Sequence, residues 1–380
     1  MSYTILGFQP LNRALANKPT VNFNYSDTIL AKAGKPVRSK LIVEGLPDNH
    51  PLQSQLLHLR VGDIINNRYV VRELIGAGGT AIVILAHDKD TRKEVAIKII
   101  SLDHIDILED ELHTTRTLSH SKPDINIFKP LAEGTIEAHK FGVFEYVRGR
   151  TLDQKMEKDR ISLPEALKII SELASILMVA ESQGIVHRDI KPENVLLRED
   201  NGKAVLFDWG LSRNKAKDGD LFGTPDYMPP EAMRGIEAGH GRDIYALGIM
   251  LWEMLNGDLP FDSVRLSSPI PIGSQIRNQR GVKENGLPPI GEMPGYEAYY
   301  NRTHALIESM TAPQREFRIQ SAAELKQRVD ELRAEIEVAQ IDIKEFEREI
   351  DALVSEPTRR TTIEGITIRT PFIEADTISA

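Results

Sequence analysis

The apolar residues of the chain repeat with one period before Gly149 and with another after it. In the first part they mostly fall in short runs separated by turn residues, which indicates β-strands. In the second part they recur every three or four residues, which indicates helices. Strands are expected at residues 69–74, 81–86, 95–100, 128–134 and 141–147, and helices at residues 105–118, 164–181, 243–255 and 303–310. The pattern predicts an α+β fold, with a small β-rich lobe followed by a larger helical lobe.

Both ends of the chain differ from this middle part. Residues 1–60 are polar and are interrupted by Pro and Gly, so they are expected to form a partly flexible arm or, alternatively, a strand or small cap on the next domain. Over residues 325–354 apolar positions alternate at spacings of four and three, which predicts a heptad helix. This helix either packs back on the helical lobe or forms a coiled coil that joins two copies through residues 325–353, and we favour the coiled coil. Residues 355–380 are rich in Thr and are expected to be disordered.

Composition excludes several classes of protein. The formal net charge of −9 gives no general signal for binding nucleic acid or an anionic membrane surface. The absence of cysteine excludes disulfides, thiol catalysis and cysteine-based zinc sites. No segment has the roughly 18 consecutive apolar residues of a membrane span, and residues 1–9 lack the pattern of a signal peptide. The sequence therefore predicts a soluble, cytoplasmic protein with no nucleic-acid and no membrane partner.

A glycine-rich turn and a lysine lie one hairpin apart in the predicted β-rich lobe. Gly76 and Gly78 separate the first two strands, where their backbone amides can approach phosphate oxygens, although hairpin turns often need glycine for shape alone. Lys98 follows the apolar run 95–97 in the third strand, from which its ammonium can reach nucleotide phosphates, although a lysine that ends an apolar run is usually solvated. A carboxylate must hold such a lysine in place. Glu111 on the following helix is the best candidate, and Glu109 is the alternative.

The segment His187–Asn194 carries the strongest chemical signal in the chain. Asp189 can accept the proton of an attacking hydroxyl, Lys191 can neutralise charge on a phosphate, and Asn194 can bind a metal ion. Asp208 follows a predicted strand fourteen residues later and can supply a second metal ligand. Each of these residues alone fits an ordinary turn, but chance does not explain all of them at this spacing.

These motifs resemble those of the Hanks-type (eukaryotic-like) serine/threonine protein kinases, over residues 61–329. The resemblance implies a bilobal protein-kinase fold in a chain of bacterial or phage origin. It implies transfer of the γ-phosphate of ATP to serine or threonine of protein substrates, with Mg²⁺ or Mn²⁺ as the metal. Catalysis would involve Asp189, Lys191, Lys98 and Glu111. By the same resemblance the ATP-binding residues are Ile75, Gly76, Ala77, Gly78, Val83, Ala96, Lys98, Phe144, Glu145, Val147 and Leu196.

Further residues match the part of such kinases that docks the substrate. Thr224 and Glu231 fall in the matching segment, and Glu231 is expected to pair with Arg318. Asp243 matches the helix that anchors the catalytic loop. Lys191 together with Thr224 implies specificity for serine and threonine over tyrosine.

Four positions depart from the family pattern. Trp209 replaces a phenylalanine and is expected to restrict inactive conformations, whereas the replacement of the third glycine by Ala81 is expected to have little effect. Pro229 stands where alanine is usual. Thr115 stands where an apolar helix residue usually completes the packed interior.

The loop before Thr224 is a further departure. Between Ser212 and Thr224 there is no Ser, Thr or Tyr, so the kinase is expected to be active without phosphorylation of this loop. In related kinases Arg188 grips a phosphate on the loop, and here Asp218 or Asp220 is expected to supply the anion.

The C-terminal tail offers possible phosphorylation sites. Thr361 and Thr362 follow two arginines and resemble a basic acceptor site, although a generic polar tail is an equal alternative. By the same resemblance Glu193 and Glu253 recognise arginine near the acceptor, so autophosphorylation is expected. The rival function is a catalytically weak pseudokinase scaffold that assembles through the coiled coil.

Overall fold

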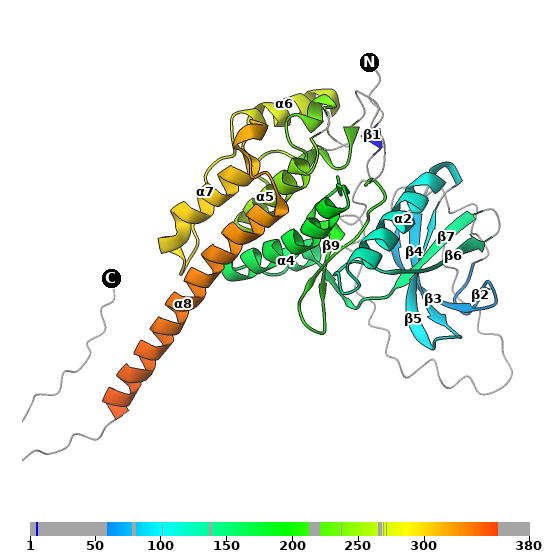
Figure 1. Ribbon diagram of the computed structural model, residues 1–380, viewed down its shortest axis with the longest axis horizontal. Helices are drawn as coiled ribbons and strands as arrows, with labels where there is room; N and C mark the ends of the chain where they lie inside the picture. Colours follow the sequence, from blue (N-terminus) through cyan, green and yellow to red (C-terminus); the bar gives the residue numbers. More distant parts are fainter. Residues whose placement is uncertain are drawn as a thin grey trace, which may run out of the picture. The chain divides into compact units, whose positions relative to one another are not determined.

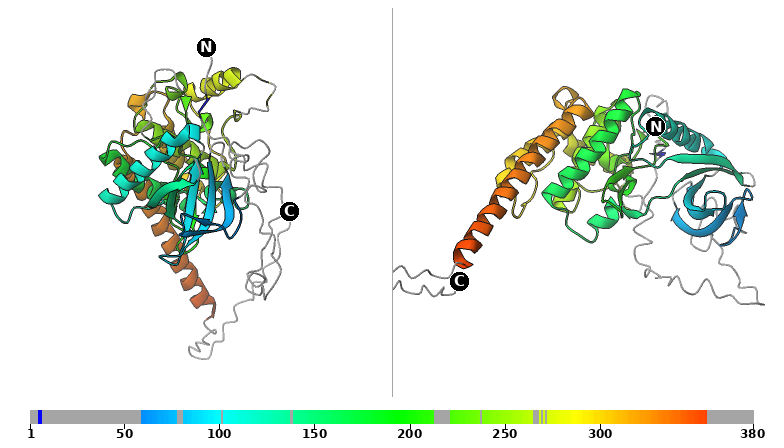
Figure 2. Two further views of the ribbon diagram at one scale, coloured as in Figure 1. Left: turned by 90° about the vertical axis from the view of Figure 1, so that its right-hand side faces the viewer. Right: turned by 60° about the horizontal axis from the view of Figure 1, so that its bottom comes forward.

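The computed structural model describes residues 5–6, 59–77, 81–100, 102–136, 139–212, 221–236, 238–264, 268, 270 and 272–355. The chain divides into two compact units, residues 1–333 and residues 334–380. Within the first unit a sheet-rich part is followed along the chain by a helical part, as Figure 1 and the right-hand view of Figure 2 both show. The predicted order of a β-rich lobe and a helical lobe is therefore confirmed.

The sheet-rich part is built on one antiparallel sheet of six strands in the order β2-β3-β4-β5-β7-β6. The strands are β2 (Ile64–Ile65), β3 (Tyr69–Ala77), β4 (Ala81–Asp88), β5 (Lys93–Ile100), β6 (Pro130–Ile136) and β7 (His139–Glu145). Alternate residues of β5 point to opposite faces of the sheet. Ile97 and Ile99 belong to the apolar core on one face, whereas Ile100 packs with Leu108 and Leu112 of α2 (Ile105–Ser121) on the other. The face that carries Lys98 is therefore the face covered by α2.

The helical part surrounds one buried helix, α5 (Gly241–Asn256), whose side chains are almost all inaccessible to solvent. Its companions are α3 (Leu152–Met156), α4 (Leu163–Ser182), α6 (Ile272–Glu284) and α7 (Tyr300–Thr311). A smaller antiparallel sheet has the order β10-β9-β8, from β8 (Gly149–Thr151), β9 (Val195–Arg198) and β10 (Ala204–Leu206). The helices expected at 164–181, 243–255 and 303–310 are confirmed within a few residues, whereas the sequence pattern did not predict α6.

A short strand close to the start of the chain pairs with a strand far along it. The strand β1 (Ile5–Leu6) runs parallel to β11 (Leu221–Phe222), with Ile5 opposite Leu221 and Leu6 opposite Phe222. This pairing places part of the N-terminal segment beside the two residues that immediately precede Gly223 in sequence. The expectation of a flexible arm otherwise falls on residues that lie outside the described ones.

The last helix, α8 (Ala322–Ser355), covers the residues for which a heptad helix was predicted. In the part of α8 that belongs to the first unit, Leu325, Val329 and Leu332 are buried. A hydrogen bond of 2.6 Å from Ser171 Oγ of α4 to Asp330 Oδ1 fixes the same turns. The beginning of α8 therefore packs on the helical part. Association of two chains through residues 325–353 stays a prediction, and the tail at 355–380 lies almost wholly outside the described residues.

None of the helices in the described part of the chain combines the length and the apolar character that crossing a membrane requires.

Candidate functional site

The lysine of β5 lies between two carboxylates that come from different parts of the fold. Lys98 Nζ is 2.6 Å from Glu111 Oε2 of α2 and 2.9 Å from Asp208 Oδ1, which follows β10. Glu109 instead forms an ion pair with Lys140 of β7. Two residues along a helix correspond to a rotation of about 200°, so only one of the two glutamates can face the lysine. The helix presents Glu111, and not Glu109, to Lys98.

This cluster favours a positive charge on the lysine. Burial alone would lower the pKa of Lys98, but the carboxylates of Asp208 and Glu111 outweigh it and raise the pKa above its usual range. The ammonium is therefore held charged and fixed in one place, as a group that is to bind phosphate oxygens must be.

A second cluster surrounds the carboxylate of Asp189. Its Oδ1 accepts hydrogen bonds from the backbone N–H of Thr224 (2.9 Å) and from the hydroxyl of the same residue (2.8 Å). Its Oδ2 is 2.9 Å from Lys191 Nζ and accepts a bond of 3.1 Å from Asn194 Nδ2. Lys191 Nζ also donates to Thr224 Oγ1 at 2.8 Å. Four groups thus lock one buried carboxylate between the segment His187–Asn194 and the segment that contains Thr224.

A side chain of α5 fixes the backbone of the loop His187–Asn194. The carboxylate of Asp243 accepts hydrogen bonds from the N–H groups of His187 (2.7 Å) and Arg188 (2.9 Å). Arg188 has a φ of 71°, a left-handed conformation that is uncommon for a residue other than glycine. Gly223 fits closely against it, because its φ is 93° and a Cβ there would lie 2.4 Å from the Arg188 carbonyl oxygen. Asp243 therefore fixes a strained turn that presents Asp189.

Asp208 is held next to this loop by its own neighbours. The N–H of Phe207 donates to the carbonyl oxygen of Asn194 at 3.0 Å, and Asp208 itself has a left-handed φ of 65°. Trp209 is fully buried, and its indole N–H donates to the Leu206 carbonyl oxygen at 3.2 Å. The tryptophan that departs from the family pattern is thus a fixed part of the interior, on which the turn with Asp208 is built.

Strand register aligns the glycine turn with the lysine. Gly76 lies opposite Val83 on β4, and Val83 lies opposite Lys98 on β5. Ala77 ends β3 just after Gly76, while Gly78 lies outside the described residues. The three aligned residues form a row across three strands that ends at the cluster around Lys98.

The other residues expected to bind nucleotide lie on β3, on β5, on β7 and just after it, and on β9. Ala96 pairs with Phe144 across β5 and β7, and both side chains are buried. The backbone N–H of Glu145 donates to the Lys129 carbonyl oxygen at 2.9 Å, so this N–H is engaged within the fold. The remaining three are the half-exposed Ile75, the buried Val147 and the half-buried Leu196.

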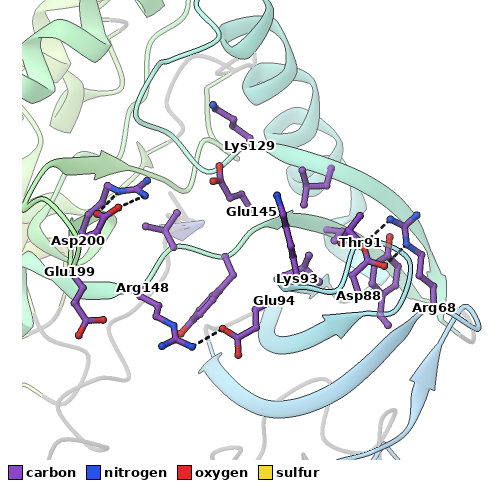
Figure 3. A pocket seen from close by; sticks show the side chains of 17 residues that line it. Arg68, Asp88, Thr91, Lys93, Glu94, Lys129, Glu145, Arg148, Glu199 and Asp200 are labelled. Atoms are coloured by element: carbon purple, nitrogen blue, oxygen red, sulfur yellow. Dashed lines mark hydrogen bonds and ion pairs between the residues drawn. The ribbon is translucent and has the colours of Figure 1, made fainter.

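A hollow in the described part is lined by residues of β5, of β7 and of the segment after β7. It has a volume of about 1040 Å³, is lined by Glu145 and Val147 among others, and contains neither Lys98 nor Asp189. Figure 3 shows charged side chains of both signs around it, including Arg148 and Glu94, which form an ion pair of 2.9 Å. The hollow is therefore separate from the site that holds the two clusters.

The end of the segment after Thr224 is tied to the far end of the helical part. Arg318 Nη1 donates to Glu231 Oε1 at 2.7 Å, and both side chains are buried. Its guanidinium also lies over the ring of Tyr245, 4.9 Å from the centroid. The contact joins residues 87 positions apart in sequence and fixes the segment at its C-terminal end.

Several residues that shape the site were not singled out from sequence. Thr114 Oγ1 and Ser212 Oγ are 2.7 Å apart and connect α2 to the loop after Trp209. Lys283 of α6 is completely buried, and it donates to backbone carbonyls of residues 225–228. Neither contact has a sequence signal, because a threonine on a helix and a lysine in a polar stretch are usually exposed.

Comparison with known proteins agrees with this geometry. The family model described as "Protein kinase domain" matches residues 69–329, which is more than half of the chain. Serine/threonine-protein kinase PrkC of Bacillus subtilis is 36 % identical over 214 residues, which are 53 % of this chain and 32 % of that protein. A probable serine/threonine-protein kinase PknB of Lactococcus lactis is 34 % identical over 217 residues, 54 % of this chain and 34 % of that protein.

A third relative extends the match. Serine/threonine-protein kinase PknB of Mycobacterium tuberculosis is 29 % identical over 281 residues, which are 69 % of this chain and 42 % of that protein. The chain thus spans about a third of the length of the first relatives that it matches. The family match, the aligned lysine–glutamate pair and the loop around Asp189 agree, and the chain belongs to the protein kinase family, with its relatives among the bacterial Hanks-type serine/threonine kinases.

Proposed function

We propose that the chain is a protein serine/threonine kinase that transfers the γ-phosphate of ATP to serine or threonine of protein substrates. The observation that carries the proposal is the set of contacts around Asp189. Lys191, Asn194 and Thr224 all reach its carboxylate, within 3.1 Å or less. A base, a cation and a metal-binding amide are thereby gathered at one point, which is what phosphoryl transfer requires of a protein.

Asp189 is proposed as the group that accepts the proton of the substrate hydroxyl. Burial alone would raise its pKa, but Lys191 and the Thr224 hydroxyl outweigh burial, and the pKa lies below its usual value. The carboxylate is therefore ionised at neutral pH and able to orient a hydroxyl. Lys191, which touches both Asp189 and Thr224, would stabilise negative charge on the phosphoryl group in transfer.

ATP is proposed to bind between the two lobes. Lys98, held by Glu111, would contact its phosphates, and the row of Gly76, Val83 and Lys98 places the glycine turn over them. Phe144 would stand as gatekeeper behind the adenine, and the backbones of Glu145 and Val147 would bond to it. The residues proposed to line the site are Ile75, Ala77, Gly78, Ala96 and Leu196.

A divalent cation, Mg²⁺ or Mn²⁺, is proposed to bind at Asn194 and Asp208. Mg²⁺ usually takes one or two oxygen ligands from the protein and the rest from phosphates and water. Because the Asn194 amide nitrogen donates to Asp189, its amide oxygen is the atom left for a cation. When bound, the cation would neutralise phosphate charge.

Specificity for serine and threonine is proposed from the Lys191–Thr224 contact of 2.8 Å. The segment from Gly223 to Glu231, here called the docking segment, is proposed to receive the protein substrate. Glu193 and Glu253 are proposed to favour arginine near the acceptor. Glu253 Oε2 already accepts a bond of 2.6 Å from the hydroxyl of Tyr227, which belongs to the docking segment.

The scaffold alternative lacks support. A pseudokinase usually lacks the lysine, the catalytic aspartate or the metal-binding aspartate, and this chain has Lys98, Asp189 and Asp208, together with Asn194. Lys98 contacts Asp208, and Asn194 contacts Asp189, as phosphoryl transfer at one site would require.

The test is transfer of radiolabelled phosphate from ATP to proteins of a bacterial lysate, with the Asp189→Asn variant as control. General-base catalysis contributes about 10²- to 10⁴-fold, so the variant should lose most of the transfer. Phosphoserine and phosphothreonine, without phosphotyrosine, are the expected products. Equal labelling by the two proteins would refute the proposal, and phosphotyrosine alone would refute the assigned specificity.

Regulation is proposed to act outside the loop before Thr224. Ser212 is buried and bonded to Thr114, so its hydroxyl is engaged in the fold. Asp218 and Asp220, the expected partners of Arg188, lie outside the described residues. The kinase would therefore be active as purified after phosphatase treatment, and loss of activity on that treatment would contradict this.

Autophosphorylation is proposed at Thr361 and Thr362, which also lie outside the described residues. Mass spectrometry after incubation with Mg²⁺ and ATP should find phosphate there, and its absence would remove the proposal. The cytoplasmic location expected from sequence stays a prediction, which fractionation of the native cells would test.

A further inference from the structure

Helix α6 carries a lysine whose side chain has no contact with solvent. Lys283 has an exposed fraction of 0 %, although lysine is almost never fully buried unless it is paired. Its Nζ donates three hydrogen bonds, to the backbone carbonyl oxygens of Pro225 (2.7 Å), Asp226 (2.9 Å) and Met228 (2.8 Å). An ammonium has three N–H donors, so every donor of this lysine is used on one short stretch of backbone.

The three carbonyls belong to the docking segment. This segment contains the one-turn 3₁₀-helix at Pro225–Tyr227, which is otherwise closed by two backbone bonds of 3.1 and 3.2 Å. A short helix leaves carbonyl groups without partners, and buried carbonyls need them. Lys283 bonds to the carbonyls of Asp226 and Met228 and adds a second bond to that of Pro225, so the conformation of the docking segment depends on a side chain from a different element.

A second residue of α6 acts on the same segment. Gln279 lies one turn before Lys283, on the same face of the helix, and its side chain is 3 % exposed. Its Nε2 donates to Asp226 Oδ1 at 2.6 Å. The same carboxylate oxygen accepts a bond of 3.1 Å from the Val264 N–H. One face of α6 therefore braces the docking segment through both its backbone and a side chain.

The ammonium is kept in place without a carboxylate at bonding distance in the described part. Burial lowers the pKa of Lys283 to about 7, and the charge of Asp226 only partly opposes this. The rings of Phe261 and Tyr245 lie 4.6 and 5.9 Å from Nζ, where their faces favour a cation. An uncompensated buried charge destabilises a fold, so an apolar side chain would fill this space at lower cost. Its role is therefore better explained by the backbone conformation that it imposes on the docking segment than by a gain in stability.

The braced segment is also the one that meets the reaction centre. Pro225, which accepts from Lys283, directly follows Thr224, and Thr224 bonds to Asp189 through both its N–H and its hydroxyl. A continuous set of hydrogen bonds thus leads from α6 through the docking segment to the proposed base.

We propose that Lys283, assisted by Gln279, is a positioning residue that holds the docking segment in the shape that receives a protein substrate beside Asp189. The inference rests on the proposed kinase function and adds to it a determinant of protein-substrate binding that lies outside the catalytic and nucleotide-binding residues. ATP does not depend on this brace, because its proposed contacts come from other elements.

The test compares Lys283→Met with wild type in the full chain, with myelin basic protein as the acceptor. The KM for this protein should rise by about tenfold or more, because bonds from a charged donor are lost. The KM for ATP should stay within about twofold, a split that a general loss of structure would not produce. Lys168→Met, the same change at an exposed site on α4, should leave both values unchanged.

An unchanged KM for myelin basic protein in Lys283→Met would overturn the inference, and so would an equal rise of both KM values. If this variant does not fold, Gln279→Leu keeps the ammonium and removes only one bond to the docking segment, together with a longer bond of 3.3 Å to the Asp262 carbonyl oxygen. Its KM for the protein should then rise by about threefold, and wild-type values in this variant would equally overturn the inference.

A second measurement does not need activity. Hydrogen exchange of residues 223–231 should be faster in Gln279→Leu than in wild type, because the brace that protects this backbone is weakened. If wild type transfers no phosphate, the kinase proposal fails while this measurement still decides whether α6 holds the segment. Equal exchange in the two proteins would reject the brace itself.

Discussion

At the scale of single residues, the site depends on charges that are buried together with their partners. Lys98 stays protonated because two carboxylates outweigh its desolvation, and Asp189 stays ionised because Lys191 and Thr224 do the same for it. Removing one partner from such a cluster leaves an uncompensated charge in the interior, which is more damaging than removing an exposed ion pair. Substitutions in the two clusters should therefore impair function far more than similar changes elsewhere.

Lys98→Met should lower kcat/KM for ATP by about 10²- to 10³-fold, because a fixed cation that contacts the phosphates is lost. Steady-state kinetics at saturating protein acceptor measure this. Lys140→Met is the matched control. Lys140 lies on the adjacent strand β7 and forms a more exposed ion pair with Glu109 of α2. A loss of similar size in both variants would mean that the lysine acts through stability alone.

The pH dependence of substrate choice should report on Glu253. Burial, the first of several causes, raises its pKa to about 8, so this carboxyl is mostly protonated at neutral pH. An acid with a raised pKa gains its charge only as the pH rises through that value. Preference for a peptide with arginine near the acceptor, over the same peptide with alanine, should therefore grow by about fivefold between about pH 6.5 and pH 8.5.

Glu253→Gln should make that preference independent of pH. The ratio of kcat/KM for the two peptides removes ionisations that affect both, including those of ATP. A ratio that is flat in wild type, or one that rises equally in the variant, would show that Glu253 does not recognise arginine.

At the scale of elements, α2 is connected to the loop after Trp209 at two points. The hydroxyls of Thr114 and Ser212 are 2.7 Å apart, and a Cβ on Gly210 would lie 2.5 Å from a side-chain carbon of Ile107. Since α2 also carries Glu111, the position of the loop and the position of the lysine's partner are coupled. This coupling is a mechanical link between the loop and the nucleotide site.

Thr114→Val should lower kcat/KM for ATP by about threefold, because it removes the bond to Ser212. Ser212→Ala removes that bond and also the bond of 2.7 Å from Ser212 Oγ to the Trp209 carbonyl oxygen, so its loss should be at least as large. The double variant should lose little more than Ser212→Ala alone, which a double-mutant cycle detects as coupling. Thr117→Val is the control on the same helix, since that hydroxyl donates within α2 to the His113 carbonyl. Fully additive losses would disprove the link.

The sequence predicted the elements with strong periodicity and the residues with fixed spacing. It predicted Asp189, Asn194 and Asp208 from short loops with fixed spacing. It preferred Glu111 but kept Glu109 as the alternative, because the phase of a helix relative to a sheet is set by tertiary packing. It missed α6, because the face of this helix toward the docking segment is polar. From sequence alone, Lys283 and Gln279 would be expected to be exposed to solvent, although both bond to the docking segment.

At the scale of the whole molecule, the boundary between the two units falls within α8, between Arg333 and Ala334. Leu325, Val329 and Leu332 are buried within the first unit, so these three heptad positions are already used by a single chain. Ile336 in the second unit is buried in the single chain as well, so the part of the heptad pattern that remains for a second chain begins after Ile336. A coiled coil that joins two kinases would therefore be shorter than the full repeat in the sequence.

Sedimentation should show a dimer for the full chain and a monomer for residues 1–338. A truncation at residue 324 or 333 would remove residues that are buried in the single chain, Ile336 among them, and would confuse loss of assembly with loss of folding. A dimer that persists for residues 1–338 would place the interface elsewhere, and a monomeric full chain would remove the coiled coil altogether.

The pairing of β1 with β11 has a practical consequence for these experiments. Leu6 lies beside Phe222, the residue before the docking segment. An affinity tag fused close to β1 would thus be anchored near the place where acceptor proteins are proposed to bind, and it would compete with them. Purification through the opposite end of the chain avoids measuring the tag in place of the enzyme.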